Sequence, residues 1–210
     1  MTLALMLTAI SIGIIHTLLG PDHYVPFIVL SKTRGWSVRK TAAITAACGA
    51  GHILSSVALG LVGAWLGISI LKLEAFDGVR GSIATWAFIA FGLVYFAWGI
   101  GRAFSKKAKE GISQKASLTA WTLFIIFVLG PCEPLIPVLM YPALSGGGVS
   151  AMFAVAAVFG IATIATMLTA VLSACYGLNF INIKSMQKWS HAAAGFAVLA
   201  CGLSMQFLGL

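Results

Sequence analysis

The sequence predicts an all-α membrane protein with six transmembrane helices in a 3+3 inverted repeat, helices 1 and 4 being broken at Gly-Pro motifs. Two observations carry this expectation. The first is composition, because 60% of the 210 residues are hydrophobic and only 9% are charged. A soluble domain of this length would carry about 25% charged residues. The second is a pair of matching proline-containing motifs, one in each half of the chain.

Six apolar segments are long enough to cross a membrane, which takes about 20 mostly apolar residues. Together they form a single integral membrane domain over residues 1–210. The start, MTLALMLTAI, lacks the positive n-region of a secretory signal and is expected to begin a mature spanning helix. Four of the segments exceed a minimal span and must tilt, kink or break. The six segments are 3–31, 41–71, 83–103, 118–144, 150–178 and 189–209.

The basic residues lie in short loops between the apolar segments. The net charge of +8 therefore does not indicate nucleic-acid binding. Loops one, three and five hold eleven Lys and Arg residues, against two in loop two and none in loop four. An excess of these residues marks cytoplasmic loops. The sequence thus predicts a multi-pass protein of the plasma (inner) membrane, with loops one, three and five in the cytoplasm and both termini outside.

The prolines fall in two regions that align at an offset of 110 residues. GPDHYVPFIVL at 20–30 matches GPCEPLIPVLM at 130–140, which sets Asp22 opposite Cys132 and His23 opposite Glu133. Two further helices follow each motif, giving repeat one (1–104) and repeat two (118–210). Three helices per repeat make the second copy inverted, as in many secondary transporters with a site near the membrane midplane. Two unrelated Gly-Pro kinks are the alternative. Proline removes a helical hydrogen bond, so the predicted helix-break residues are Gly20, Pro21, Pro26, Gly130, Pro131, Pro134 and Pro137.

Ionisable side chains inside the spans are the candidate functional residues, since each costs about 3 kcal/mol or more at the membrane centre. Glu74, Asp77 and Glu110 are expected in loops and His191 near an interface. Imidazole, carboxylate and thiolate together suit a borderline divalent transition metal. A helix–helix hydrogen bond at His52, and a polar network at Asp22 and His23, are the alternatives. The predicted metal ligands are His16, Asp22, His23, His52, Cys132 and Glu133.

The four cysteines all lie in apolar segments, without a CxxC pair or zinc-finger spacing. A soluble zinc module or a secreted disulfide framework is therefore not indicated. Cys48, Cys175 and Cys201 are expected to behave as small apolar residues. Cys132 differs from them because it lies inside the second proline motif.

Two resemblances arise at these motifs. His16, the GPDH stretch and the GH of the next helix resemble the nickel/cobalt permeases of the urease-accessory type, in the lysine-exporter (LysE) superfamily. This resemblance implies that His16, Asp22, His23 and His52 handle the metal. The GPCEPLIP motif resembles the thiol-disulfide membrane proteins of cytochrome c biogenesis, which carry a proline-flanked Cys in each repeat. Here Asp22 stands where the second of those cysteines would be.

The leading prediction is a transition-metal cation permease that is not an enzyme and has no permanently bound cofactor. Its substrate would be a divalent metal, nickel or cobalt being favoured and zinc or iron being further candidates. Its partners would be that cation and the lipid bilayer, and a homodimer is compatible with the sequence. The first alternative is a thiol-disulfide electron conduit using Cys132 and Cys48 with a thioredoxin-like partner. The second is a small-anion or sulfur-compound exporter, disfavoured because no Lys or Arg is expected deep in a span.

Overall fold

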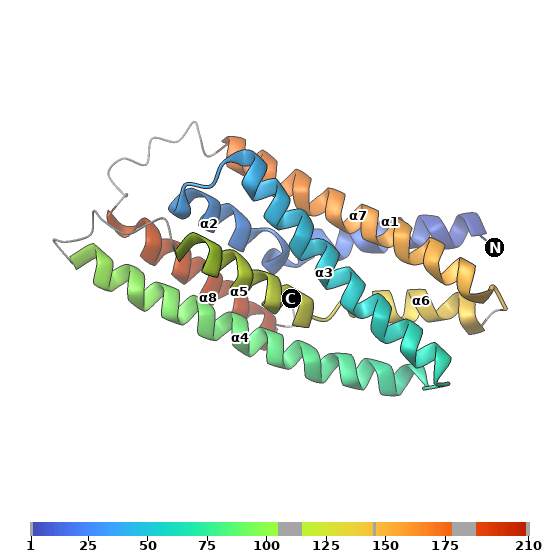
Figure 1. Cartoon of the computed structure of the whole chain (residues 1–210). Helices are drawn as coiled ribbons and strands as arrows, with labels where there is room; N and C mark the ends of the chain where they lie inside the picture. Colours follow the sequence, from blue (N-terminus) through green and yellow to red (C-terminus); the bar gives the residue numbers. More distant parts are fainter. Residues whose placement is uncertain (1, 105–114, 145, 178–187, 209–210) are drawn as a thin grey trace.

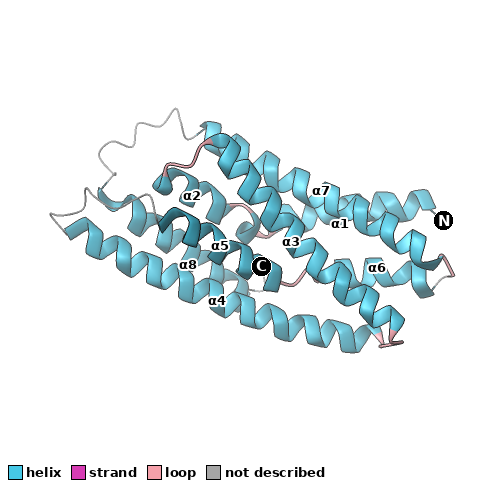
Figure 2. Cartoon of the chain, in the orientation of Figure 1, coloured by secondary structure: helices cyan, strands magenta, loops and turns pink. Residues whose placement is uncertain are grey.

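The computed structural model describes residues 2–104, 115–144, 146–177 and 188–208, and every regular element within these ranges is a helix (Figure 2). Eight of these elements are α-helices, and one, η1, is a short 3-10 helix. In chain order they are α1 (Thr2–Leu19), η1 (Pro21–His23), α2 (Val25–Arg34), α3 (Val38–Trp65), α4 (Ile70–Phe104), α5 (Lys115–Leu129), α6 (Leu135–Leu144), α7 (Gly148–Gly177) and α8 (Ser190–Leu208).

Among the described residues, four helices are each long and apolar enough to cross a membrane: α3, α4, α7 and α8. A fifth span results if α1 is taken together with η1 and α2, which continue it at an angle of 85°. Large apolar side chains such as Leu54, Val94 and Ile161 are exposed along these helices. Such surfaces suit contact with hydrocarbon, so the architecture fits a multi-pass membrane protein.

The first helix ends at Leu19, two residues before Pro21. The Gly20 amide still donates to the His16 carbonyl at 3.0 Å, but Pro21 has no N–H to continue the ladder. The chain tightens into η1, where the His23 amide donates to the Gly20 carbonyl at 3.1 Å. Helix α2 then begins at Val25 with Pro26 in its first turn, where a proline is tolerated.

A second interruption separates α5 from α6. Helix α5 ends at Leu129, and α6 begins at Leu135, whose amide donates to the Cys132 carbonyl at 2.9 Å. Pro131 lies in the gap and cannot donate to the carbonyl of Phe127 four residues earlier. Pro134 immediately precedes α6 and Pro137 lies in its first turn, while Pro142 lies within it. The predicted span 118–144 is therefore two helices.

The prediction of a loop around residues 72–82 is wrong, because α4 begins at Ile70 and the connection from α3 covers only 66–69. Asp77 is 1% exposed and forms an i,i+3 ion pair with Arg80 on the same helix. The Arg80 guanidinium also donates to Ser56 Oγ on α3 at 2.6 Å. Pairing between neighbours one turn apart stabilises these charges within a helix. A count of charged residues does not reveal such pairing.

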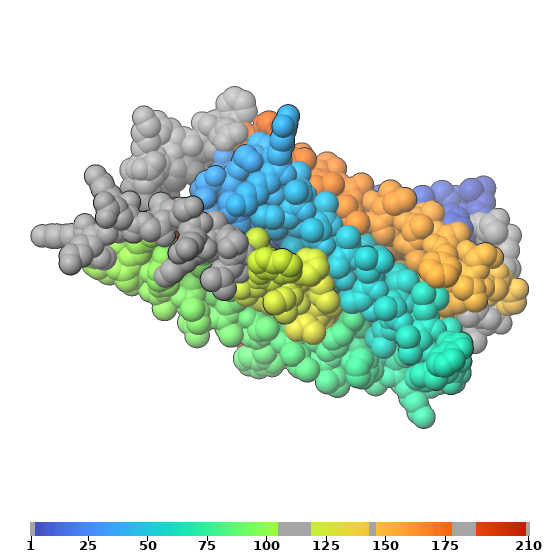
Figure 3. All heavy atoms as spheres, in the orientation of Figure 1, coloured from blue at the N-terminus to red at the C-terminus, as the bar shows by residue number. Residues whose placement is uncertain are grey.

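The helices pack closely along the length of the bundle. Helices α4 and α8 form the most extensive contact, α1 packs along α7, and α3 packs against both α5 and α7 (Figure 1). Glycines on both partners permit the close α4–α8 approach, since any Cβ there would meet the facing backbone or side chain. These glycines are Gly92 and Gly99 on α4 and Gly195 and Gly202 on α8. Figure 3 shows α5 between α3 and α4 on the face in view.

Candidate metal site

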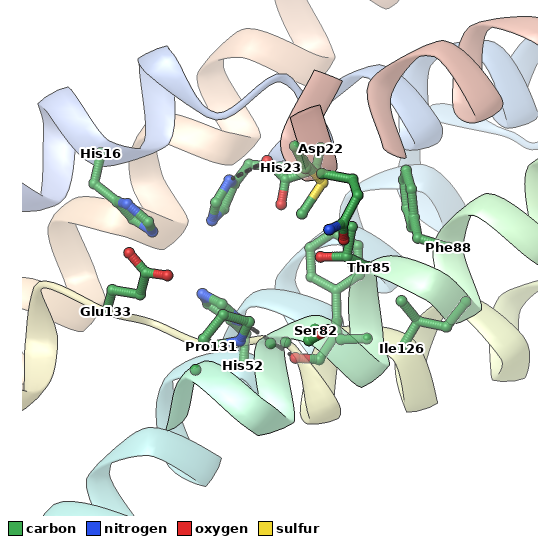
Figure 4. A pocket seen from close by; sticks show the side chains of 17 residues that line it. His16, Asp22, His23, His52, Ser82, Thr85, Phe88, Ile126, Pro131 and Glu133 are labelled. Atoms are coloured by element: carbon green, nitrogen blue, oxygen red, sulfur yellow. Dashed lines mark hydrogen bonds and ion pairs between the residues drawn. The ribbon is translucent and has the colours of Figure 1, made fainter. Parts of the chain in front are cut away.

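A cavity of about 330 Å³ lies at the two helix interruptions. Its walls come from the end of α1, η1, α3, α4, the α5–α6 gap and the last turns of α8. Figure 4 shows the polar side chains gathered around it. The ionisable and polar lining side chains are His16, Asp22, His23, His52, Ser82, Thr85, Glu133 and Gln206.

Three histidines converge on this cavity from three elements. One ring nitrogen each of His16, His23 and His52 lies within 4.8 Å of those of the other two. In all three rings Nε2 is buried and has no hydrogen-bond partner among the described residues. A buried polar atom without a partner is costly and calls for an explanation. Three histidines with such atoms around one cavity are the arrangement expected of ligands that share one cation.

The second interruption itself orients His52. Pro131 has no N–H, so the Phe127 carbonyl does not receive the hydrogen bond from position 131 that a regular helix would provide. His52 Nδ1 lies 3.3 Å from this carbonyl oxygen. Donation from Nδ1 puts the single proton of a neutral imidazole on that nitrogen, which leaves the Nε2 lone pair free. The proline that breaks the helix thus helps to fix the tautomer of a histidine on a different helix.

His23 is oriented in the same way at the first interruption. Its Nδ1 lies 3.0 Å from Asp22 Oδ1 and 3.2 Å from the Gly20 carbonyl, two acceptors that favour a proton on Nδ1. Its Nε2 therefore also points into the cavity as a lone pair. Histidine ligands of metals regularly donate their other ring N–H to a carboxylate or a backbone carbonyl. Asp22 and the Phe127 carbonyl occupy these two supporting positions.

Gly20 is the residue that leaves room for the Asp22–His23 pair. A Cβ at this position would lie 2.6 Å from His23 Nδ1 and 2.8 Å from Asp22 Oδ1. We expect Gly20→Ala to displace both groups and to weaken metal binding by about tenfold, the scale typical of losing a supporting partner. Equilibrium titration with Co²⁺ measures this change. Gly101→Ala is the matched control, since a Cβ there meets nothing within 4 Å, and an equal loss in both variants would contradict the assignment.

Glu133 and Cys132, the acid and the thiol of the second motif, lie in different surroundings. Glu133 lines the cavity, and in Figure 4 its carboxylate faces the side where His16 lies. Cys132 is fully buried outside the lining, in an apolar cluster that includes Leu135 and Leu139. Its amide donates to Ser56 Oγ at 3.3 Å. The structure therefore does not bring Cys132 into the cavity lining with Asp22, His23 and Glu133, because adjacent residues of this irregular segment direct their side chains apart.

The other cysteines do not line the cavity either. All four thiols are free and buried. Cys48 belongs to an apolar cluster with Phe127 and Leu123, separate from the cluster that holds Cys132. Cys175 Sγ lies 3.2 Å from Ser31 Oγ. No pair of cysteines in the described ranges forms a disulfide.

Helix α4 contributes lining residues that the sequence analysis missed. Gly78, Gly81, Ser82 and Thr85 recur at spacings of three and four, which puts them on one helical face toward the cavity. A Cβ at Gly81 would meet the Pro131 ring, so this small residue lets α4 approach the second interruption. A stripe of small and hydroxyl residues on one face was the signal that could have identified them.

Comparison of the chain with protein-family models, with curated proteins and with solved structures gives no match. Membership of the lysine-exporter superfamily therefore stays a prediction. The fold and the geometry of the cavity are the basis for assigning a function.

Proposed function

We propose that the protein is a transition-metal cation permease whose central site is exposed alternately to the two sides of the membrane. The observation that carries this proposal is the convergence of His16, His23 and His52, which bring one ring nitrogen each within 4.8 Å of the others and which all have a buried, unpartnered Nε2. Intramembrane ionisable residues are costly and typically mark an ion or substrate pathway. Two of the three rings have an acceptor at Nδ1 that favours the metal-binding tautomer.

The donor set indicates the class of cation. Imidazole nitrogen suits nickel, cobalt, zinc and iron, and the carboxylates of Asp22 and Glu133 offset the positive charge of a divalent ion. The thiol of Cys132 does not line the cavity, so its lining offers no thiolate, and the sulfur that it does offer is the thioether of Met205. Nickel or cobalt remains the favoured cargo, with zinc or iron as further candidates.

The packing of the helices supports two inverted repeats. If α1, α2 and α3 correspond to α5, α6 and α7, an internal two-fold axis must exchange their contacts. The contact of α1 with α7 has its counterpart in that of α5 with α3, and the contact of α2 with α7 in that of α6 with α3. Helices α4 and α8 would be partners across the axis. Rocking of one repeat against the other would then expose the site alternately.

The distribution of charge along the bundle supports the proposed orientation. Arg34, Lys40 and Arg102 lie near one end, where α2 connects to α3 and where α4 ends (Figure 1). The start of α1 and the α3–α4 connection lie at the other end. We assign the basic end to the cytoplasm. The predicted loops three and five fall largely on 105–114 and 178–187, outside the described residues.

Purified protein in proteoliposomes tests the proposal directly. We expect the wild-type protein to bind Co²⁺ or Ni²⁺ and to move it across the vesicle membrane, measured by elemental analysis and by a metal-sensitive dye inside the vesicles. Protein that binds no first-row divalent metal under any loading condition would refute the permease assignment.

The same assay separates the permease from a thiol-disulfide conduit. Because Cys132 and Cys48 lie in separate apolar clusters outside the cavity lining, the double variant Cys132→Ser/Cys48→Ser is expected to retain metal binding and transport. A mixed disulfide trapped between Cys132 and a thioredoxin-like protein would favour the conduit instead. An anion exporter was disfavoured because no Lys or Arg was expected within a span, but Arg80 lies within α4. Its pairing with Asp77 leaves it less available to an anion.

A further inference from the structure

We call the cavity lined by His16, His23 and His52 the histidine cavity. A second cavity, of about 280 Å³, adjoins it and shares Gly78 and Glu133 with it. Its other lining residues are Glu74, Asp77 and Ile136. We call this second cavity the acidic vestibule. Three carboxylates from two different elements, α4 and the α5–α6 gap, therefore face one space beside the site.

Helix α4 defines the order of the two cavities along the bundle. Its residues Glu74, Asp77 and Gly78 line the vestibule, and Gly81, Ser82 and Thr85, further along the helix, line the histidine cavity. At 1.5 Å per residue, Glu74 and Ser82 are about 12 Å apart along the axis. The vestibule thus lies between the histidines and the end of the bundle where α4 begins (Figure 1).

The burial of Asp77 supports a cation site in the vestibule independently of the number of acidic residues. Its side chain is 1% exposed, yet it lines the vestibule. Arg80 pairs with one carboxylate oxygen, Oδ1, whereas Oδ2 is buried and accepts no hydrogen bond from the described part of the chain. A buried carboxylate oxygen without a donor is costly, and a cation in the vestibule would satisfy it.

Most of the acidic residues of this basic chain line the two cavities. The net charge is +8 and there are only five acidic residues. Four of them line the two adjoining cavities, and the fifth, Glu110, lies outside the described residues. The four are Asp22, Glu74, Asp77 and Glu133. A cleft lined by one sign of charge concentrates ions of the opposite sign and speeds their association.

We propose that the acidic vestibule is a second cation site, where a hydrated divalent cation binds to Glu74, Asp77 and Glu133 before it moves to the histidines. The inference rests on the proposed permease function. Carboxylate oxygens bind hard or still hydrated divalent ions, Ca²⁺ and Mg²⁺ included, whereas imidazoles select transition metals. Glu133, which faces both cavities, is the group that can stay with the ion as water is exchanged for imidazole nitrogen.

Stopped-flow mixing of the purified full-length protein with Co²⁺ tests this site, with the visible absorption of the bound ion as the readout. We expect Glu74→Gln/Asp77→Asn to slow association about tenfold at low ionic strength, within the range known for electrostatic steering. The dissociation rate is expected to stay unchanged. At constant ionic strength, Ca²⁺ should slow Co²⁺ association in the wild-type protein and have no such effect in the double variant.

Glu74→Asp, which keeps the charge, is the matched control and should retain the wild-type rate. If the loss of Asp77 prevents folding, Glu74→Gln alone serves, because Glu74 is exposed. Equal association rates and equal Ca²⁺ effects in wild type and variant, with Co²⁺ still bound, would overturn the vestibule alone. Wild-type protein that gives no Co²⁺ absorption would overturn the permease assignment and the vestibule with it.

Discussion

Replacing His52 with alanine is expected to weaken Co²⁺ binding by more than the roughly 10- to 100-fold that the loss of a supporting partner costs. The change removes one of the three histidine ligands, and it also removes one of two donors to the Phe127 carbonyl, which keeps the Gly130 amide at 3.2 Å. Transport in proteoliposomes should fall with it. Isothermal titration of the purified variant, with elemental analysis of the protein after gel filtration, measures the effect.

His191→Ala is the control for this experiment. His191 lies at the start of α8, where its Nδ1 and the Tyr95 hydroxyl are hydrogen-bonded at 3.0 Å. It does not line the histidine cavity. We expect this variant to bind Co²⁺ as the wild type does. If both histidine variants lose affinity equally, the loss reflects general destabilisation and the three-histidine site is refuted.

Replacing Asp22 with asparagine is expected to lower Co²⁺ affinity by about 10- to 100-fold. The variant keeps the size of the side chain and removes the charge that accepts from His23 Nδ1 at 3.0 Å. His23 would retain the Gly20 carbonyl as an acceptor, at 3.2 Å, so the ring should stay near its place. The loss should therefore appear in affinity and in the absorption spectrum of bound Co²⁺, while the thermal unfolding temperature changes little.

Asp22→Glu tests whether charge or position matters more. Its longer side chain keeps the charge but shifts the acceptor, so an intermediate affinity is expected if Asp22 orients His23. Asp22→Asn protein with wild-type affinity would show that the Asp22–His23 pair only stabilises η1, which was the alternative considered for these two residues.

Much of the candidate site followed from local sequence. His23 of the GPDH motif, His16 about one helical turn before that motif and His52 in the next helix were all predicted to be metal ligands. The structure brings these three histidines together. Glu133 lines the same cavity. The prediction was possible because an ionisable group in an apolar segment is too costly to lie there without partners.

Other parts of the site could not be predicted in this way. The sequence gives no direction for Cys132, whose side chain joins an apolar cluster while that of its neighbour Glu133 faces the cavity. Asp77 and Arg80 resembled loop residues by charge alone, and only their mutual pairing and the contact with Ser56 hold them inside the bundle. Such choices depend on groups far away in the chain.

The sequence by itself indicated the apolar helices and most of the ionisable residues around the cavity, because apolar runs and missing N–H groups are chain-local properties. It wrongly assigned Glu74, Asp77 and Arg80 to a loop. The tertiary structure decided how the freed groups are satisfied. The Phe127 carbonyl meets His52 of another helix, and that contact favours the tautomer that leaves Nε2 free for a cation. Pro131 removes one amide donor from the Phe127 carbonyl, which still accepts from the Gly130 amide, but only the packing of α3 against α5 brings His52 to this oxygen.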